Sequence, residues 1–164
     1  MYSQRYQGMS SMKRIVEQQG SNDLYITTPI YYVNALPHIG HAYTSVASDT
    51  LSRYAKLEGN EAFLVTGTDE HGEKVAESAE KMNEKPYEYA TRISKKFQNL
   101  ADSYGIKYDA FVRTTSKEHA SAVEALWKRI EEKDDIYLGA YEGWYCVRDE
   151  CYYTESELID GKAP

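Results

Sequence analysis

The chain has 164 residues, of which 41% are hydrophobic and 27% are charged, with 10 glycines and 4 prolines. This composition excludes a collagen-like or low-complexity chain, and no apolar run is long enough to span a membrane. It predicts a soluble globular protein. The net charge is -7, but residues 1–130 carry 16 basic and 16 acidic side chains, whereas residues 131–164 carry 3 and 10. Because phosphate groups bind lysine and arginine, we expect no nucleic-acid contact in the acidic final section.

Residues 1–23 mix serine, glutamine and glycine without a sustained period, and they lack the apolar stretch of a secretory signal. We interpret them as a flexible leader. Arg5, Lys13 and Arg14 leave an organelle-targeting role as an alternative. The expected location is therefore the cytoplasm, with an organelle as the second possibility.

Three elements are predicted in the first half of the chain. Residues 24–28 are β-branched and aromatic and are followed by Pro29, which predicts a short buried strand. Residues 62–66 form a continuous apolar run up to Gly67, typical of a strand buried on both faces of a parallel sheet. Between them, residues 41–57 have the period of a helix whose buried face would carry Tyr43, Ala47, Leu51 and Tyr54.

The second half continues the alternation of strands and helices. One short helix contains Val75, Ala79 and Met82, and a longer one begins at Pro86 and places Ile93, Phe97, Leu100 and Tyr104 on one face. Residues 110–113 read as a third strand. Thr115 and Glu118 form a capping box for a last helix, with Ala120, Val123, Trp127 and Ile130 on its buried face. This order predicts an α/β fold with a parallel sheet.

The character of the sequence changes at residue 134, where we place a domain boundary. Residues 136–147 read as short antiparallel strands separated by turns. Cys146 and Cys151 are too few for a disulfide framework and lack the further ligands of a zinc site, so we interpret them as free thiols in a reducing compartment. The chain stops within this hairpin-rich section, which indicates a fragment.

Residues 37–41, Pro-His-Ile-Gly-His, lie between the first strand and the first helix, where open α/β sheets bind ligands. The N-terminus of the helix attracts an anion, and Gly40 has no side chain, so a flat or charged group can come close to the backbone. His38 and His41 add hydrogen-bond donors. The pattern predicts a phosphate site without the Gly-Lys-Ser/Thr of a Walker loop. A metal-binding histidine pair and plain polar residues at a helix start are the alternatives.

Residues 27–41 resemble the HIGH signature of class I aminoacyl-tRNA synthetases, and the flanks are similar to the methionine-specific members of bacterial and organellar type. Residues 66–72, Thr-Gly-Thr-Asp-Glu-His-Gly, and residues 141–146, Tyr-Glu-Gly-Trp-Tyr-Cys, are also similar to that family. The resemblance runs from about residue 24 to the end. It implies the first half of a Rossmann-like nucleotide-binding domain in residues 24–133 and the start of a β-rich connective insertion in residues 134–164.

The resemblance also implies a reaction: L-methionine and ATP with Mg²⁺ give methionyl adenylate and pyrophosphate, and the methionyl group passes to tRNA(Met). His38 and His41 match the catalytic positions and, with Gly40, the ATP-binding positions. The methionine-binding positions match Ile30, Tyr32 and Asp69, the last of which would hold the α-ammonium group. Core packing for Tyr32 and a helix-cap role with Gly72 for Asp69 are the alternatives.

Two departures from the family affect what this chain can do. Asp149 stands where the metal knuckle of some members has its second cysteine, so we expect no zinc and no other resident metal. The later Lys-Met-Ser-Lys-Ser-like signature, the second half of the nucleotide fold and the anticodon-binding helices are missing. We therefore expect the isolated chain to be inactive, with any tRNA contact mostly outside it.

Two other functions fit parts of the pattern. Small adenylyltransferases use a similar His-x-Gly-His and have nearly this length, but the nearest match to their second phosphate motif is residues 114–116, Thr-Thr-Ser. A truncated synthetase paralogue that acts as a binding module is the third reading.

Overall fold

The computed structural model describes residues 23–164, so the predicted leader lies outside the described residues except for Asp23. The chain divides into two compact units, one ending at Val123 and one beginning at Glu124. The first unit contains a four-stranded sheet, and its strands are β1 (Leu24–Thr27), β2 (Tyr31–Tyr32), β3 (Ala62–Asp69) and β4 (Ala110–Arg113).

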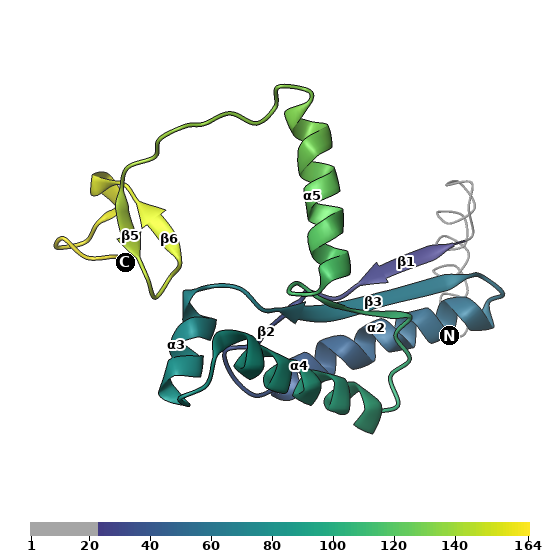
Figure 1. Ribbon diagram of the computed structural model, residues 1–164. Coiled ribbons are helices and arrows are strands. Elements are labelled where there is room, and N and C mark those ends of the chain that lie inside the picture. The colour runs from purple at the N-terminus through teal and green to yellow at the C-terminus, as the bar shows by residue number, and fades with distance from the viewer. Residues whose placement is uncertain (1–22) are drawn as a thin grey trace, which may run out of the picture. The chain divides into compact units, whose positions relative to one another are not determined.

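The sheet is built around β3, and all of its pairings are parallel (Figure 1). Strand β1 pairs with residues 62–65 of β3, and β2 pairs with residues 68 and 69. Strand β4 pairs with residues 65–68, so it occupies the opposite edge. The predicted α/β class with a parallel sheet is confirmed. The two-residue strand β2 is new, because a strand this short leaves no periodic pattern in the sequence.

Helices α2 (Ile39–Leu57), α3 (Glu73–Lys81) and α4 (Pro86–Ser103) follow in the first unit, and α5 (Lys117–Glu131) runs across the boundary. Helices α2 and α4 cover one face of the sheet (Figure 1). As predicted, Val75, Ala79, Ile93 and Phe97 are buried, and they form one core cluster together with residues from β2 and α4. Met82, also predicted for this core, is 63% exposed at the end of α3.

The buried face predicted for α2 is wrong. Tyr43, Leu51 and Tyr54 are exposed, and the buried side chains are Ala42, Ser45, Asp49, Ser52 and Ala55. Small side chains let this helix approach the sheet closely. Asp49 is buried because Arg53 and the backbone N–H of Lys107 donate to its carboxylate, at 2.6 and 2.9 Å. A polar side chain with such partners occupies a core position that an apolar pattern does not indicate.

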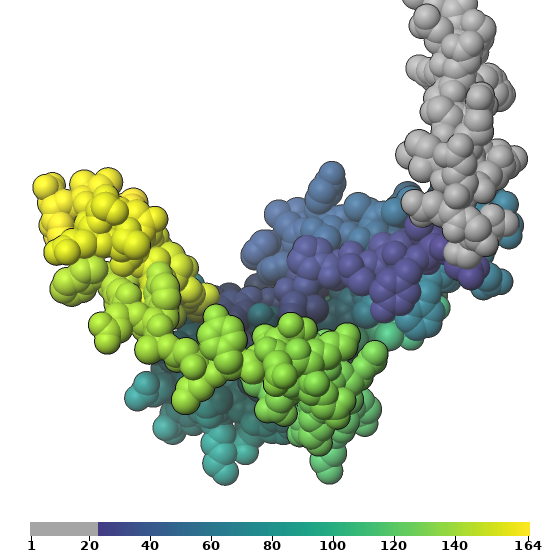
Figure 2. All heavy atoms as spheres, turned by 90° about the horizontal axis from the view of Figure 1, so that it is seen from above, coloured from purple at the N-terminus to yellow at the C-terminus, as the bar shows by residue number. Residues whose placement is uncertain are grey.

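The prediction that residues 62–66 are buried on both faces is also wrong for the described residues. Leu64 and Thr66 are buried toward the helices, whereas Phe63 on the other face is 46% exposed and stacks on Tyr25, with ring centroids 5.7 Å apart. Atoms of β1, in purple, lie at the surface in Figure 2. The continuous apolar run therefore correctly indicates a parallel strand but not helices on both sides.

Gly67 does not end β3, which continues to Asp69. A Cβ atom at Gly67 would lie 2.1 Å from the carbonyl oxygen of Val112 in β4. Glycine is thus the residue that lets β3 and β4 pair closely here. The extra length of β3 brings Asp69 beside Tyr32 of β2.

The second unit contains an antiparallel hairpin of β5 (Trp144–Cys146) and β6 (Cys151–Tyr153), followed by a short 3-10 turn, η1 (Glu155–Glu157). The predicted antiparallel character is confirmed for residues 144–146, but residues 136–141 form no strand. The domain boundary near residue 134 stays a prediction.

Helix α5 differs from its prediction at the start and on its apolar face. Ser116, rather than Thr115, accepts the backbone N–H of His119, at 3.2 Å. None of its side chains is buried among the described residues, and Val123 and Trp127 are 49% and 54% exposed. The amphipathic pattern correctly predicts the helix, but the described part of the chain does not cover its apolar face.

Candidate active site at the carboxyl ends of the strands

The two histidines of residues 37–41 form the N-terminal cap of α2. The Nδ1 atom of His38 accepts the backbone N–H of Gly40 at 3.1 Å, and the Nδ1 atom of His41 accepts the backbone N–H of His38 at 3.1 Å. The two rings stack with centroids 3.8 Å apart. This reciprocal capping box satisfies backbone donors that the first turn of a helix leaves without partners.

The same hydrogen bonds assign the tautomer of both rings. An Nδ1 atom that accepts a hydrogen bond carries no proton, so the ring proton of His38 and of His41 lies on Nε2. Burial, followed by the electrostatic effect of the adjacent His38 ring, holds the pKa of His41 below its usual value of 6.5. The site therefore offers two Nε2–H donors beside the positive end of the helix dipole, an arrangement suited to a phosphate group.

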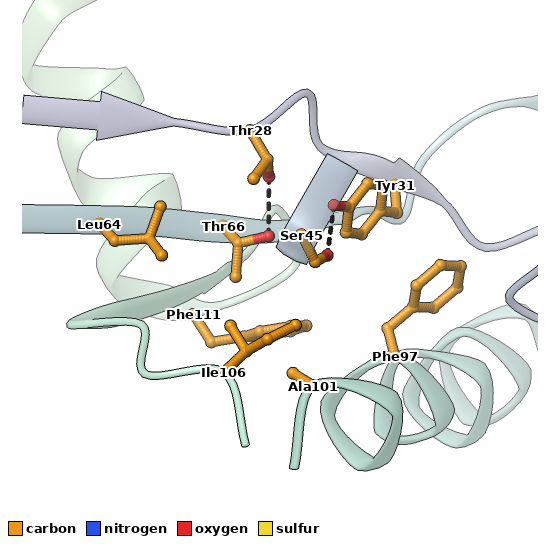
Figure 3. Close-up of a pocket in the computed structure, with 9 residues that line it drawn as sticks. All are labelled: Thr28, Tyr31, Ser45, Leu64, Thr66, Phe97, Ala101, Ile106 and Phe111. Carbon is orange, nitrogen blue, oxygen red and sulfur yellow. Dashed lines mark hydrogen bonds between the residues drawn. The ribbon is translucent and has the colours of Figure 1, made fainter. Parts of the chain in front are cut away.

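Packing fixes the position of His41. Its ring meets Tyr31 and Phe97 edge-on, with centroids 5.0 Å away in both cases. The hydroxyl groups of Tyr31 and Ser45 are 2.7 Å apart, and those of Thr28 and Thr66 are also 2.7 Å apart (Figure 3). Together with apolar neighbours these side chains enclose a cavity of about 10 Å³. That volume admits at most one water molecule, so the cavity belongs to the support beneath the site.

Asp69, Tyr32 and Gly72 lie together at the carboxyl ends of β2 and β3. Tyr32 and Asp69 are register partners. A Cβ atom at Gly72, whose φ is +112°, would lie 2.3 Å from the Tyr32 hydroxyl oxygen, so the phenol rests against this glycine. Within the described residues, the carboxylate of Asp69 takes part in no hydrogen bond or ion pair. A free carboxylate beside an aromatic wall can hold an ammonium group.

The structure tests the alternative roles of Asp69 as a helix cap, of Tyr32 as a core residue and of the two histidines as polar residues of a helix start. Helix α3 has Gly72 as its N-cap, without a side-chain hydrogen bond, so Asp69 does not cap a helix. Tyr32 is half-buried and also packs against the core cluster, so core packing and a place in a pocket are compatible for it. Ile30 is 47% exposed just before β2. The histidines do serve as polar residues of a helix start, while their Nε2 atoms stay available.

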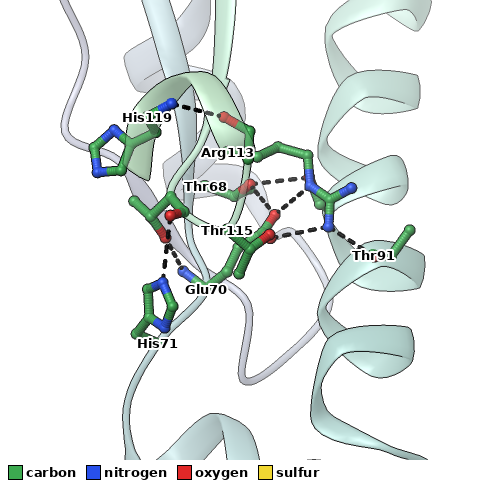
Figure 4. A network of polar contacts seen from close by, with 10 residues as sticks. Thr68, Glu70, His71, Thr91, Arg113, Thr115 and His119 are labelled. Atoms are coloured by element: carbon green, nitrogen blue, oxygen red, sulfur yellow. Dashed lines mark hydrogen bonds and ion pairs between the residues drawn. The ribbon is translucent and has the colours of Figure 1, made fainter. Parts of the chain in front are cut away.

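Sequence reasoning missed the buried carboxylate next to Asp69. The side chain of Glu70 has no exposed surface, and Arg113 of β4 binds it with two hydrogen bonds of 2.7 and 2.9 Å (Figure 4). Thr68 donates to the same carboxylate at 2.7 Å, and Thr115 donates to it as well. Arg113 also donates to Thr91 of α4. The network ties β3, β4 and α4 together directly behind Asp69.

This network keeps Glu70 ionised. Burial by itself raises the pKa of Glu70, but the hydrogen bonds from Arg113, Thr115 and Thr68 and the charge of Arg113 outweigh it and lower the pKa below its usual value of 4.5. The only signals in the sequence were Glu70, two residues after Thr68, and Arg113, the last residue of the strand predicted at residues 110–113. Neither has a pattern that separates it from an ordinary surface charge.

The metal knuckle expected for some family members does not fit the side chains present here. The thiol of Cys146 donates to the carboxylate of Asp149 at 3.2 Å, and Arg148 binds the same carboxylate. Arg148, followed by Cys146, lowers the pKa of Asp149 to about 2. Between residues 23 and 164 no group of three histidine, cysteine or acidic side chains is arranged to hold a metal ion.

The lowered pKa of His41 gives a testable pH dependence. Well above pH 6.5 the ring is neutral in both the folded and the unfolded chain. As the pH falls below 6.5 the unfolded chain binds a proton first, so the free energy of unfolding decreases toward the lowered pKa. Urea unfolding between pH 7.5 and 5 should therefore show a steeper loss for the wild type than for His41→Asn, which keeps an acceptor near Nδ1. Equal slopes would contradict the assignment.

Comparison with known proteins agrees with this fold. A family model described as "tRNA synthetases class I (M)" matches residues 24–164, and the chain therefore belongs to this family. A methionine--tRNA ligase from Rickettsia bellii is 50% identical over 142 residues, which are 87% of this chain and 28% of that protein. A probable mitochondrial methionine--tRNA ligase from Dictyostelium discoideum is 46% identical over 91% of this chain and 26% of that protein.

Solved structures show the same likeness. Methionyl-tRNA synthetase from Mycobacterium tuberculosis, in complex with methionyl-adenylate, has a TM-score of 0.78 and 44% identity, over 85% of this chain and 28% of that one. A leucyl enzyme from Agrobacterium radiobacter, at 21% identity and a TM-score of 0.72, shows the shared fold alone. The chain thus spans between 22% and 28% of the length of these relatives. Among the described residues, no helix is long and apolar enough to cross a membrane.

Proposed function

We propose that this chain is the part of a methionine--tRNA ligase that binds methionine and the α-phosphate of ATP. The complete enzyme joins L-methionine to AMP with release of pyrophosphate, from ATP with Mg²⁺ as the substrate complex, and transfers the methionyl group to tRNA(Met). The observation that carries the proposal is the pair of Nε2–H donors at the start of α2. The ends of β2 and β3 present Tyr32 and the carboxylate of Asp69, which has no hydrogen-bond or ion-pair partner in the part of the chain that the structure describes.

The chemistry assigned to the histidines follows from their tautomers. The methionine carboxylate attacks the α-phosphorus in line with the departing pyrophosphate, and negative charge grows on the α-phosphate oxygens. The Nε2–H groups of His38 and His41 are fixed by capping and stacking before this charge develops, so they stabilise it without reorganisation. Gly40 has no side chain and leaves room for the nucleotide against the helix start.

The methionine side of the site follows from the strand ends. Asp69 binds the α-ammonium group, and Ile30 and Tyr32 line the space for the thioether side chain, which is apolar and polarisable. The glycine at position 72 allows the Tyr32 phenol to approach the loop after β3. This arrangement directs the methionine carboxylate toward the helix start.

We further propose that residues 134–164 begin a connective insertion whose knuckle holds no zinc, since Asp149, which accepts a hydrogen bond from Cys146, stands in the place of the second thiolate. The cytoplasm is the proposed location, with an organelle as the alternative that the mitochondrial relative favours.

A chimera tests the proposed function directly. Residues 24–164 of this chain replace the matching segment of the Rickettsia bellii enzyme, to which they are 50% identical. We expect methionine-dependent exchange of pyrophosphate into ATP by the chimera and none by the isolated chain, because the later signature loop is missing from its sequence. The same chimera with Asp69→Ala should require a higher methionine concentration.

The outcomes separate the alternatives. Exchange that depends on another amino acid would contradict the methionine assignment. Release of pyrophosphate by the isolated chain when a phosphate-ester acceptor replaces the amino acid, with AMP transferred to that acceptor, would favour a small adenylyltransferase. A folded chimera without exchange would favour the binding-module reading.

A further inference from the structure

Cys146 and Cys151 face each other across the β5–β6 hairpin. They are direct register partners in this antiparallel pair, and both are half-buried free thiols. Directly opposed residues have Cα atoms about 4.5 or 5.5 Å apart, depending on the hydrogen-bonding pattern. Both distances fall in the range of about 4.4–6.8 Å that a disulfide bond requires. Opposed side chains also lie on the same face of the hairpin.

The hairpin keeps this arrangement without a cross-link. Tyr152 packs against Tyr141 and Tyr145, with ring centroids 5.1 and 5.0 Å apart. The connecting residues 147–150 form a turn in which Glu150 has a φ of +53°. Asp149 lies beside Cys146, but among the described residues no group of three histidine, cysteine or acidic side chains is arranged to hold a metal ion. Two thiols that face each other can undergo thiol–disulfide exchange.

We propose that Cys146 and Cys151 form a reversible dithiol site, which a low-molecular-weight disulfide of the glutathione class oxidises to a cross-strand disulfide bond. One thiolate attacks a sulfur atom of oxidised glutathione, so that a mixed disulfide forms and one glutathione thiolate leaves. The second cysteine thiolate attacks the protein sulfur of that mixed disulfide and releases the second glutathione. The protein loses two protons and two electrons, and one oxidised glutathione becomes two reduced molecules.

The short connection makes the site a switch rather than a permanent cross-link. Only four residues separate the two cysteines, so the disulfide removes little conformational freedom from the unfolded chain. The bond should therefore be reduced readily by an excess of thiol. Oxidation also removes the hydrogen bond from Cys146 to Asp149.

The test uses the whole 164-residue chain in buffers of reduced and oxidised glutathione, with intact-mass measurement after acid quenching. We expect the oxidised chain to be lighter by two hydrogen atoms, to carry no glutathione, to form no intermolecular disulfide and to fall from two titratable thiols to none. Dithiothreitol should restore both thiols. Chains with Cys146→Ser or Cys151→Ser should stop at a mixed disulfide with glutathione.

A matched variant tests the register. Cys151→Ser combined with Tyr153→Cys keeps two thiols and the Tyr152 contacts, but it moves one thiol two residues along, opposite Trp144, where diagonal neighbours are about 7–8 Å apart. In buffer this variant should accumulate mixed disulfides with glutathione. In urea, where the hairpin is lost, the variant and the wild type should form an intramolecular disulfide bond to the same extent. Doubly glutathionylated or intermolecularly linked wild-type chain in buffer would overturn the proposal, and so would equal closure of both chains in buffer.

Discussion

Removing Arg113 from its ion pair with Glu70 should lower the free energy of unfolding by about 3–5 kcal/mol, because the Glu70 side chain has no exposed surface and loses its compensating charge. Removing the charge of Glu70 should cost less, because the Arg113 side chain is 24% exposed and water partly solvates the charge that remains. The variants are Glu70→Gln and Arg113→Met, and urea unfolding measured at pH 7 gives the change. The expected loss is large because Glu70 is fully buried and accepts hydrogen bonds from Arg113, Thr68 and Thr115.

Two controls show whether charge burial is the cause. Arg92 and Glu84 form a similar bidentate pair, but the side chains are 44% and 31% exposed, so Arg92→Met should have a much smaller effect. The double variant Glu70→Leu with Arg113→Met leaves no buried charge and should lose less than the sum of the two single changes. Additive losses would show that the two side chains act independently, contrary to the structure.

The same network also makes the stability depend on pH. Burial lowers the pKa of His41, whereas hydrogen bonds and the charge of Arg113 lower the pKa of Glu70. The pKa of Glu70 is lowered in the folded chain, so its contribution is complete above the usual glutamate value of 4.5 and is lost as the pH falls through the lowered pKa. The wild type should therefore lose stability in this acid range, and Glu70→Gln should lose less.

Much of the fold follows from local patterns. Strands β1, β3 and β4 and the helices of the first unit could be located because their periods and end signals are local properties of the chain, as Pro86 at the start of α4 shows. The helix start with His38 and His41 was located for the same reason, since it lies between a strand and a helix. The apolar pattern did not predict which face of α2 is buried. Asp49 is buried because its carboxylate has hydrogen-bond partners, and Ser52 because its side chain is small, so neither is marked by hydrophobicity.

The candidate site was only partly accessible from the sequence for a related reason. Strand β2 exists because Tyr31 and Tyr32 pair with the far end of β3, and that pairing joins residues more than 35 positions apart. The partnership of Glu70 with Arg113 spans 43 positions. Long-range pairs of this kind depend on which strands become neighbours, and propensity and periodicity carry no information about that choice.

The second large effect concerns the two histidines in an active enzyme that carries this segment, such as the chimera. Asparagine places an oxygen near the position of Nδ1, so His38→Asn or His41→Asn keeps the cap of α2 but removes the Nε2–H donor. We expect the rate of adenylate formation to fall roughly 100- to 1000-fold, as is typical when one preorganised donor to a developing charge is removed. Glutamine, whose amide reaches the position of Nε2, should restore part of the rate at the cost of the cap.

Methionine affinity separates these roles from that of Asp69. The ammonium group is charged before and during the reaction, so Asp69→Asn should weaken methionine binding first, whereas the histidine variants should leave the methionine dissociation constant nearly unchanged. Pre-steady-state measurement of adenylate formation at several methionine concentrations gives both quantities. If His38→Asn and His41→Asn raised the dissociation constant and kept the first-order rate, the Nε2–H groups would act in substrate binding and not on the charge of the transition state.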